Sequence, residues 1–282
     1  LIGISNIIVI YVGGNQYIEG KINIGVIAEF IIYITMLTWP VAVVGWVTSI
    51  IQQAEASQKR INSFLKSKSS IDNYGKILNL KSSDIKFKNV SFKYPETNLY
   101  ALKNINFSIE SGKTLGIIGK TGSGKSTILE LITRSYDVTS GNIYLDSQLL
   151  SSYDLKSLKS FISYVPQNSF LFSDTIIENI KFGNYTAKDS EVNKVAKDSS
   201  IHSDISRFKD EYETLLGERG VNLSGGQIQR ITIARALLKK SKILILDDCL
   251  SSVDAKTERN ILFNIKKGKK EETVIIVSHK IS

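Results

Sequence analysis

The sequence predicts an α/β domain preceded by α-helices that span a membrane, and three observations carry this prediction. Phe30 to Ile51 is an uncharged run of 22 residues, long enough to cross a bilayer. The stretch GKTGSGKST, from Gly119 to Thr127, joins an apolar strand to a helical pattern. The run ILIL ends in Asp247 and Asp248, as a buried parallel strand does when it delivers carboxylates to a site at its C-terminal end.

Composition excludes some classes of protein. The chain has 282 residues, enough for one large domain or two smaller ones. The net charge is +9, but Lys and Arg are spread along the soluble part without interleaved aromatic residues, so direct nucleic-acid binding is not expected. The single cysteine, Cys249, excludes an internal disulfide and fits a reducing compartment. We expect it to be a packing residue rather than a reactive thiol.

The N-terminal part is expected to form membrane helices. We expect Leu1 to Val12 to be the last part of one membrane helix. Gly13 to Gly25 is expected to be a polar turn, and Val26 to Ile51 a second membrane helix. The alternative, a buried hairpin in a soluble protein, is disfavoured by the length of the second run. Basic residues follow that run, at Lys59, Arg60, Lys66 and Lys68. They predict that the chain after Ile51 is cytoplasmic.

The remaining boundaries follow from composition. The chain starts without Met or a charged segment before its apolar block, which predicts that it begins within a longer protein. Residues 1–65 are assigned to the membrane part, and the membrane helix is expected to continue through the polar segment up to Phe64. Residues 66–83, rich in Ser, Lys and Asn, are expected to be a linker, and 84–282 the α/β domain. Two strands, IKFKNVSF and LYALKNINFSIE, lead to TLGIIG at Thr114 to Gly119, which is expected to be a buried strand.

The stretch from Gly119 to Thr127 matches the P-loop pattern G-x-x-x-x-G-K-[ST]. Its glycines allow backbone N–H groups to turn inward around a phosphate, and the following helix adds the positive end of its dipole. Lys125 would reach the terminal phosphates, and the Ser126 hydroxyl would bind Mg²⁺. A merely Gly-rich turn is disfavoured by the strand–loop–helix context. The candidate phosphate-binding residues are Gly119, Lys120, Thr121, Gly122, Ser123, Gly124, Lys125, Ser126 and Thr127.

A second phosphate-binding candidate, LSGGQ at Leu223 to Gln227, opens the amphipathic stretch IQRITIARALLKK. A helix N-terminus with glycines and a serine offers backbone N–H groups and a hydroxyl to a phosphate. Its candidate residues are Ser224, Gly225, Gly226 and Gln227.

Together these motifs resemble the C-terminal part of an ATP-binding cassette (ABC) transporter of the exporter type, a multidrug-like half-transporter, and the resemblance covers essentially the whole chain. It implies a RecA-like core, an antiparallel β subdomain and an α-helical subdomain. It also implies a head-to-tail dimer in which the P-loop of one domain and the LSGGQ of the other enclose each ATP.

The activity that this resemblance implies is ATP hydrolysis, with ATP and Mg²⁺ as cofactors, coupled to alternating access of a membrane exporter. The implied partners are a second half-transporter, membrane lipid, and a transported small molecule, lipid or peptide, with no nucleic acid. The implied location is the cell inner membrane, as a multi-pass protein with its nucleotide-binding domain on the cytoplasmic side.

The resemblance also assigns roles to single residues. Tyr94 stands where the family stacks an aromatic ring on adenine, and Asp254 in the dimer-contact loop. Without their place in the family's motifs, these residues would be read differently: Tyr94 as a packing residue, Gln167 as an exposed loop amide and His279 as a structural histidine. The implied Mg²⁺ ligands are Ser126, Gln167 and Asp247, and the implied catalytic residues are Lys125, Gln167, Asp248 and His279, the last of them at the γ-phosphate. Gln167, in YVPQNSFLF, would also meet the attacking water.

Asp248 departs from the family pattern, which usually has glutamate there to polarise the attacking water. Aspartate draws the carboxylate back by about one C–C bond, and errors near 1 Å can cost on the order of a hundredfold in rate. We therefore expect slow hydrolysis at this site. Family members with this change are typically one half of a heterodimer. The intact LSGGQ and the stretch LTWPVAVVGW, from Leu37 to Trp46, favour a heterodimer over a homodimer in which Asp248 suffices.

Two other functional classes remain as alternatives. One is a soluble ABC ATPase of repair or translation, which acts on nucleic acid or ribosomes; the N-terminal apolar segments disfavour it. The other is a regulatory subunit that binds nucleotide and hydrolyses it weakly. Asp248 favours that class, whereas Lys125, Gln167 and His279 weigh against it.

Overall fold

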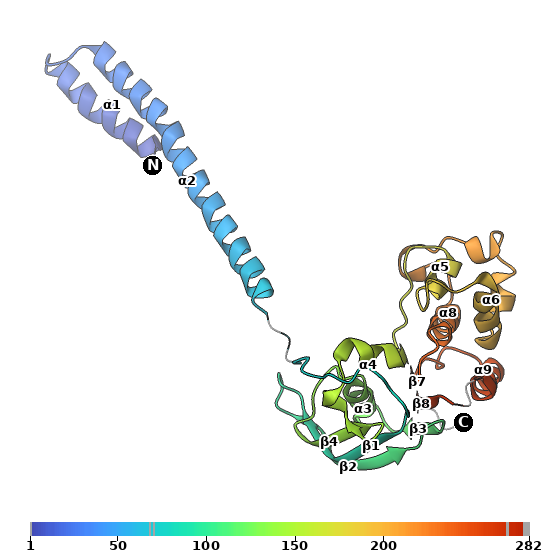
Figure 1. Ribbon diagram of the computed structural model, residues 1–282. Coiled ribbons are helices and arrows are strands. Elements are labelled where there is room, and N and C mark those ends of the chain that lie inside the picture. The colour runs from blue at the N-terminus through green and yellow to red at the C-terminus, as the bar shows by residue number, and fades with distance from the viewer. Residues whose placement is uncertain (1, 68, 70, 269–270, 279–282) are drawn as a thin grey trace. The chain divides into compact units, whose positions relative to one another are not determined.

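The computed structural model describes residues 2–67, 69, 71–268 and 271–278. The chain divides into two compact units, Leu1–Ser69 and Ser70–Ser282. Figure 1 shows that the first unit consists of helices and that the second contains both sheets.

The first unit is a helical hairpin of α1, Ile2–Ile18, and α2, Ile24–Leu65. α2 contains Pro40 in its interior. It continues into the polar segment, as expected. The predicted turn over 13–25 is wrong in its first half, because α1 extends to Ile18. Gly13 lies within α1, against α2. A Cβ at that position would lie 2.9 Å from the Ile27 side chain, so the glycine allows the helices to pack closely without ending α1.

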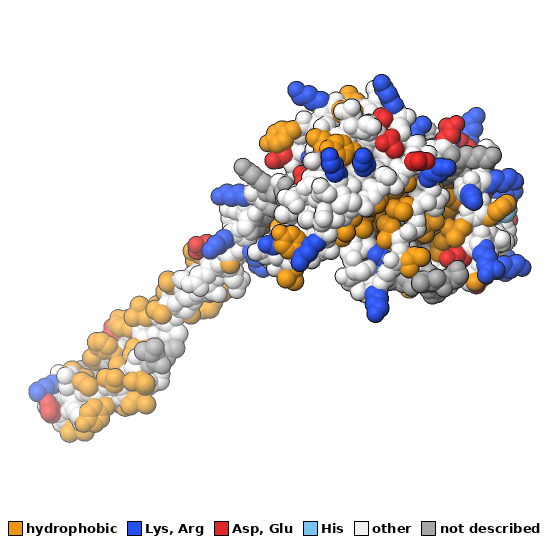
Figure 2. All heavy atoms as spheres, turned by 90° about the horizontal axis from the view of Figure 1, so that it is seen from below, with side chains coloured by type: hydrophobic (Ala, Val, Ile, Leu, Met, Phe, Trp, Pro, Cys, Tyr) orange, Lys and Arg blue, Asp and Glu red, His pale blue; other side chains and the backbone are white. Residues whose placement is uncertain are grey.

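The apolar side chains of this hairpin are largely exposed. α2 has no buried residue, and Figure 2 shows apolar side chains along the hairpin. Within the described residues, α2 is the one helix that is long and apolar enough to cross a membrane; α1 has 17 residues. A surface of this kind is costly in water and favourable in lipid.

Among its described residues, the second unit has two four-stranded sheets. The antiparallel sheet has the order β2-β1-β4-β5, and the parallel sheet has the order β3-β8-β7-β6. The strands of the first are β1 (Ile85–Lys93), β2 (Tyr100–Ile109), β4 (Ser140–Leu145) and β5 (Gln148–Leu149). Those of the second are β3 (Thr114–Ile118), β6 (Ile162–Val165), β7 (Ile243–Asp247) and β8 (Thr273–Ser278).

The helices of this unit fall into two groups. Near the sheets lie α3 (Lys125–Ile132), α4 (Leu155–Phe161) and α9 (Ala255–Gly268). The stretch between β6 and β7 forms a separate helical part, with α5 (Ile176–Lys181), α6 (Asp189–Asp198), α7 (His202–Ile205) and α8 (Gly225–Leu238). Figure 1 shows α5, α6 and α8 grouped away from β1, β2 and β4. The three-part α/β architecture that the resemblance implied is therefore confirmed.

The core lies on both faces of the parallel sheet, and β7 is buried along its whole length. Its side chains alternate between two apolar clusters: Ile243 and Ile245 pack with the antiparallel sheet and α3, whereas Leu244 and Leu246 pack with the helical part. A strand covered on both faces reads as a continuous apolar run, which explains the sequence ILIL.

One expectation about the domain's start is revised. β3 was expected to be buried but is half-exposed, because it forms an edge of the parallel sheet among the described residues. The expected linker over 66–83 stays a prediction, and most of this segment falls within the second unit. Asn73 and Asp154 share a hydrogen bond of 2.9 Å, and Lys76 N donates to Ser152 O at 2.9 Å. Gly75 permits this contact, since a Cβ there would lie 1.9 Å from the carbonyl oxygen of Tyr153.

Candidate nucleotide-binding site

The parallel sheet brings the predicted chemical groups to one edge. In the strand pairing, Asp247 is level with Val277, and the next residue, Ser278, is level with Ile118. The P-loop starts directly after Ile118, at Gly119. The carboxyl ends of β7, β8 and β3 therefore place Asp247 and the P-loop along the same edge, where ligands bind in open α/β sheets.

The P-loop connects β3 to α3 through two glycines in the left-handed backbone region. Gly122 has φ +78°, and Gly124, the N-cap of α3, has φ +89°. L-residues rarely adopt this region, and glycine does so without steric cost. The sharp turn directs the chain into α3 with its unpaired N–H groups at the loop, which is the arrangement that binds phosphate.

Gly124→Ala is expected to destabilise the protein by about 1–3 kcal/mol. The new Cβ would lie 2.8 Å from Leu102 Cδ2 and 2.9 Å from Ala101 O, in addition to the backbone strain. Thermal unfolding measures the loss. Gly122→Ala is the matched control, because it meets strain but has no atom within 4 Å of its Cβ. Equal losses in the two variants would show that the contact with Ala101 and Leu102 contributes nothing.

Lys125 lies at the centre of this loop. Its side chain is 6% exposed, and its ammonium donates to Gly119 O at 2.7 Å and to Lys120 O at 2.8 Å. These bonds hold the positive charge within the loop. The neighbouring Ser126 is exposed and leads the first turn of α3 with its hydroxyl available to a ligand.

The paired aspartates at the end of β7 have different environments. Asp247 is 5% exposed, and its Oδ2 accepts a hydrogen bond of 2.9 Å from Tyr164. Asp248 turns out of the strand with φ +45°, and its Oδ2 accepts from Gln167 Nε2 at 3.4 Å. The structure thus brings together Gln167 and Asp248, which are 81 residues apart.

These residues fit a magnesium ion by their chemistry. Mg²⁺ prefers hard oxygen ligands, and Asp247, Ser126 and Gln167 offer a carboxylate, a hydroxyl and an amide oxygen. Among the described residues there is no group of three or more His, Cys, Asp or Glu that could hold a metal. Mg²⁺ at nucleotide sites does not need one, because phosphates and waters complete its octahedron.

The LSGGQ segment forms the N-terminus of α8. Ser224 is the N-cap: its hydroxyl accepts from Gln227 N at 3.3 Å, and Gln227 Oε1 accepts from Ser224 N at 2.9 Å. This reciprocal capping box fixes the first turn. A Cβ at Gly226 would lie 2.8 Å from Ser252 O, so the glycine lets α8 approach the loop that follows Asp248. α8 belongs to the helical part and α3 to the core (Figure 1).

Tyr94 lies beside α3. Its hydroxyl donates to Glu130 Oε2 at 2.9 Å and lies 2.9 Å from Thr127 Oγ1. Its ring meets Phe92 and Tyr136 edge-on. Burial raises the pKa of this hydroxyl, so it stays protonated at neutral pH. The adenine-stacking role expected for Tyr94 remains a prediction.

The remaining two predicted site residues are Asp254 and His279. Asp254 Oδ1 accepts from Thr257 N at 3.0 Å and from Lys256 N at 3.2 Å, at the start of α9. Hydrogen bonds from Thr257 lower the pKa of this carboxyl. His279 lies outside the described residues, directly after β8.

Cys249, next to the aspartates, is buried, and this burial raises its pKa to about 12. Since the thiolate is the reactive form, only about one thiol in ten thousand would be ionised at pH 8. We expect iodoacetamide to label Cys249 slowly in the folded protein and rapidly in denaturant. Mass spectrometry follows the labelling. Fast labelling of the folded protein would contradict the assignment of Cys249 as a packing residue.

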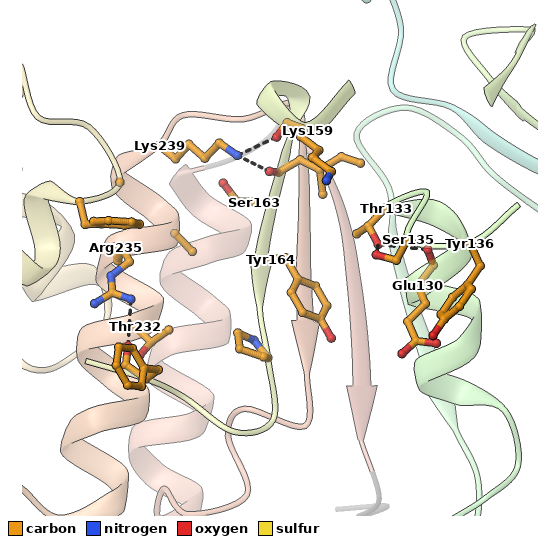
Figure 3. Close-up of a pocket in the computed structure, with 16 residues that line it drawn as sticks. Glu130, Thr133, Ser135, Tyr136, Lys159, Ser163, Tyr164, Thr232, Arg235 and Lys239 are labelled. Atoms are coloured by element: carbon orange, nitrogen blue, oxygen red, sulfur yellow. Dashed lines mark hydrogen bonds between the residues drawn. The ribbon is translucent and has the colours of Figure 1, made fainter. Parts of the chain in front are cut away.

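Sequence reasoning missed Tyr164 and Glu130. Both line a cavity of about 790 Å³ between the core and the helical part. Figure 3 shows Tyr164 between Arg235 and Thr232 from α8 on one side and Glu130 from α3 on the other. The one signal in the sequence was the position of Tyr164, at the end of a strand and three residues before Gln167.

A comparison with protein-family models matches residues 102–251 to the family described as "ABC transporter". Among curated proteins, the multidrug resistance-like ATP-binding protein MdlA of Escherichia coli (strain K12) is 40% identical over 281 residues. The probable multidrug resistance ABC transporter ATP-binding/permease protein YheI of Bacillus subtilis (strain 168) is 38% identical over 283 residues. Both alignments cover 100% of this chain and 48% of the relative, so the chain spans about half the length of these relatives.

Among solved structures, a bacterial Atm1-family ABC exporter with ATP bound matches with a TM-score of 0.76 and 33% identity. The match covers 92% of this chain and 46% of the exporter chain. The P-loop between β3 and α3, the capped LSGGQ helix and the family match over 102–251 lead to one conclusion: the chain belongs to the ABC transporter family.

Proposed function

We propose that this chain is the ATP-hydrolysing end of a membrane exporter that couples nucleotide binding and hydrolysis to alternating access. The observation that carries the proposal is the alignment of the P-loop and Asp247 along one edge of the parallel sheet, with Gln167 against Asp248. One relative is named as a multidrug resistance-like protein and another as a probable multidrug resistance transporter, and the matching solved structure is named as an exporter.

The roles in hydrolysis follow from the positions of the groups. Lys125 and the N-terminus of α3 would stabilise charge on the phosphates. Mg²⁺, held by Asp247, Ser126 and Gln167, would supply further charge stabilisation. Asp248 would accept the proton of the attacking water, oriented by Gln167, and His279 would contact the γ-phosphate.

A second domain would complete the site. LSGGQ opens α8 in the helical part, whereas the P-loop opens α3 in the core. A head-to-tail dimer would place the LSGGQ of one domain over the P-loop of the other. ATP would then close the dimer because its γ-phosphate contacts both domains, and hydrolysis would reopen it.

The short carboxylate of Asp248 supports a heterodimer. This site would bind MgATP and hydrolyse it slowly, while the intact LSGGQ completes a faster site on the other half-transporter. The transported substrate would be a small molecule, lipid or peptide. The protein would lie in the cell inner membrane as a multi-pass protein, with its nucleotide-binding domain in the cytoplasm.

A regulatory subunit is the second candidate function, and Asp248 is the observation that favours it. In that case the protein would bind ATP and change conformation, with negligible hydrolysis at its own site. The buried Lys125 and the Gln167–Asp248 contact weigh against this candidate, because both groups belong to the hydrolytic machinery. A soluble ATPase acting on nucleic acid or ribosomes is disfavoured by the exposed apolar surface of α2.

Membrane fractionation of cells that express the full-length protein tests the exporter proposal. We expect the protein to stay in the membrane after a wash with alkaline carbonate, and inverted vesicles from cells that also express its half-transporter partner to hydrolyse MgATP. Membranes from cells that express neither half-transporter provide the background rate. Release of the protein into the soluble fraction by the wash would contradict the proposal.

A further inference from the structure

Tyr164 has no role in the proposed mechanism, yet it contacts one of the mechanism's buried carboxylates. Its hydroxyl donates to Asp247 Oδ2 at 2.9 Å. We propose that Tyr164 is a positioning residue that holds Asp247 in the orientation in which it binds Mg²⁺. This inference rests on the proposed role of Asp247 in holding the metal.

Strand register explains how the two side chains meet. Tyr164 on β6 pairs with Ile245 on β7, and Asp247 is two residues further along β7. Because side chains alternate between the faces of a sheet, Ile245 and Asp247 lie on the same face, with Tyr164 diagonally beside Asp247. Ile245 packs in the cluster that contains α3 residues, so this is the face of the phosphate-binding helix.

The carboxylate depends on this hydrogen bond. Asp247 is 5% exposed, and a buried carboxylate is costly unless hydrogen-bond donors compensate for lost water. The phenol supplies such a donor to Oδ2. With Oδ2 so engaged, rotation of the carboxylate is restricted, and Oδ1 would be the oxygen left to bind a metal or its bound water.

Tyr164 depends on the same bond for its own orientation. Its side chain is 40% exposed and borders the 790 Å³ cavity (Figure 3). Close packing therefore constrains the Tyr164 ring on one side only. The hydrogen bond to Asp247 fixes the position of its hydroxyl group. Removal of the Tyr164 hydroxyl alone should leave the fold intact but free the Asp247 carboxylate to rotate. This difference distinguishes a positioning role of Tyr164 from a structural role.

The test measures how strongly Mg²⁺ enhances nucleotide binding. The dissociation constant of the non-hydrolysable analogue adenylyl imidodiphosphate is determined for the full-length protein in EDTA and in Mg²⁺. The ratio of the two constants is the metal enhancement. Outer-shell partners of metal ligands typically contribute 10–100-fold in metal affinity. We expect Tyr164→Phe to reduce the enhancement about 10-fold and to leave the constant in EDTA unchanged.

Tyr153→Phe is the matched control. It also removes one tyrosine hydroxyl, which donates to Leu145 O at 3.1 Å in the core. We expect it to lower the melting temperature and to leave the metal enhancement unchanged. A loss of enhancement as large as that of Tyr164→Phe would mean that general loosening is responsible, and would overturn the inference.

Asp247→Asn gives a second, independent measurement. If Tyr164 acts through Asp247, Tyr164→Phe should cause no further loss of enhancement in an Asp247→Asn background, since residues that act through one contact are not additive. An additive loss would overturn the inference. The proposed function fails separately: if Mg²⁺ does not enhance binding to the unmodified protein, the metal site itself is wrong. If the metal enhancement is the same in the unmodified protein and in Tyr164→Phe, only the positioning role of Tyr164 is wrong.

Discussion

Replacing Lys125 with alanine is expected to lower the rate of ATP hydrolysis by about 10²–10³-fold, with weaker ATP binding. The ammonium is buried among the loop carbonyls of Gly119 and Lys120, so its charge acts on a phosphate through little water. Electrostatic stabilisation is the main contribution of the protein to phosphoryl transfer. Single-turnover hydrolysis of ATP at this chain's own site, in the transporter assembled with its partner, measures the loss.

Lys120→Ala provides the control for this prediction. Lys120 would bind phosphate through its backbone N–H, which alanine retains. Its side chain carries the same charge as that of Lys125 but is exposed. Its loss should change the rate by less than about threefold, because exposed charges are screened by solvent. Comparable losses for the two lysines would mean that the net charge of the loop, rather than the position of Lys125, stabilises the phosphates.

Asp248→Glu is expected to increase hydrolysis at this chain's own site by about 10–100-fold. Asp248 leaves β7 with φ +45° and meets Gln167 Nε2 at 3.4 Å, so its carboxylate already faces the residue expected to orient the attacking water. One added methylene would advance the carboxylate toward that water by about one C–C bond. Single-turnover hydrolysis of radiolabelled ATP by the assembled transporter measures the change.

Asp248→Asn and Asp248→Ala complete this series. Asn preserves the size of the side chain but cannot accept a proton, so it should remove the remaining activity of this site. The interpretation of Asp248 as a slow base fails if Asp248→Glu leaves the rate of the assembled transporter unchanged while Asp248→Ala abolishes it.

Local sequence patterns predicted the parts of the site that depend on neighbouring residues. The turn at Gly122 and Gly124, the first turn of α3 and the N-cap at Ser224 are set within a few residues, so their motifs could be read directly. The burial of Ile243–Asp247 was also predictable, because a strand covered on both faces is apolar throughout.

Contacts between distant segments could not be predicted in the same way. Tyr164 and Asp247 are 83 residues apart, and their bond depends on the register of β6 against β7, which neither segment encodes alone. The residues around Gly75 have the composition of a linker, but their backbone groups pair with Ser152. The amino-acid composition of a segment indicates how readily its side chains can be buried, but it does not indicate which backbone groups will form hydrogen bonds.

The most direct test is the steady-state ATPase activity of the full-length protein in lipid, alone and together with its half-transporter partner, each with Asp248 and with Asp248→Glu. We expect activity only in the presence of the partner, and an increase when glutamate replaces Asp248. Robust activity of the protein alone, unchanged by glutamate, would contradict a slow site within a heterodimer and would mean that Asp248 acts as an adequate base in a homodimer.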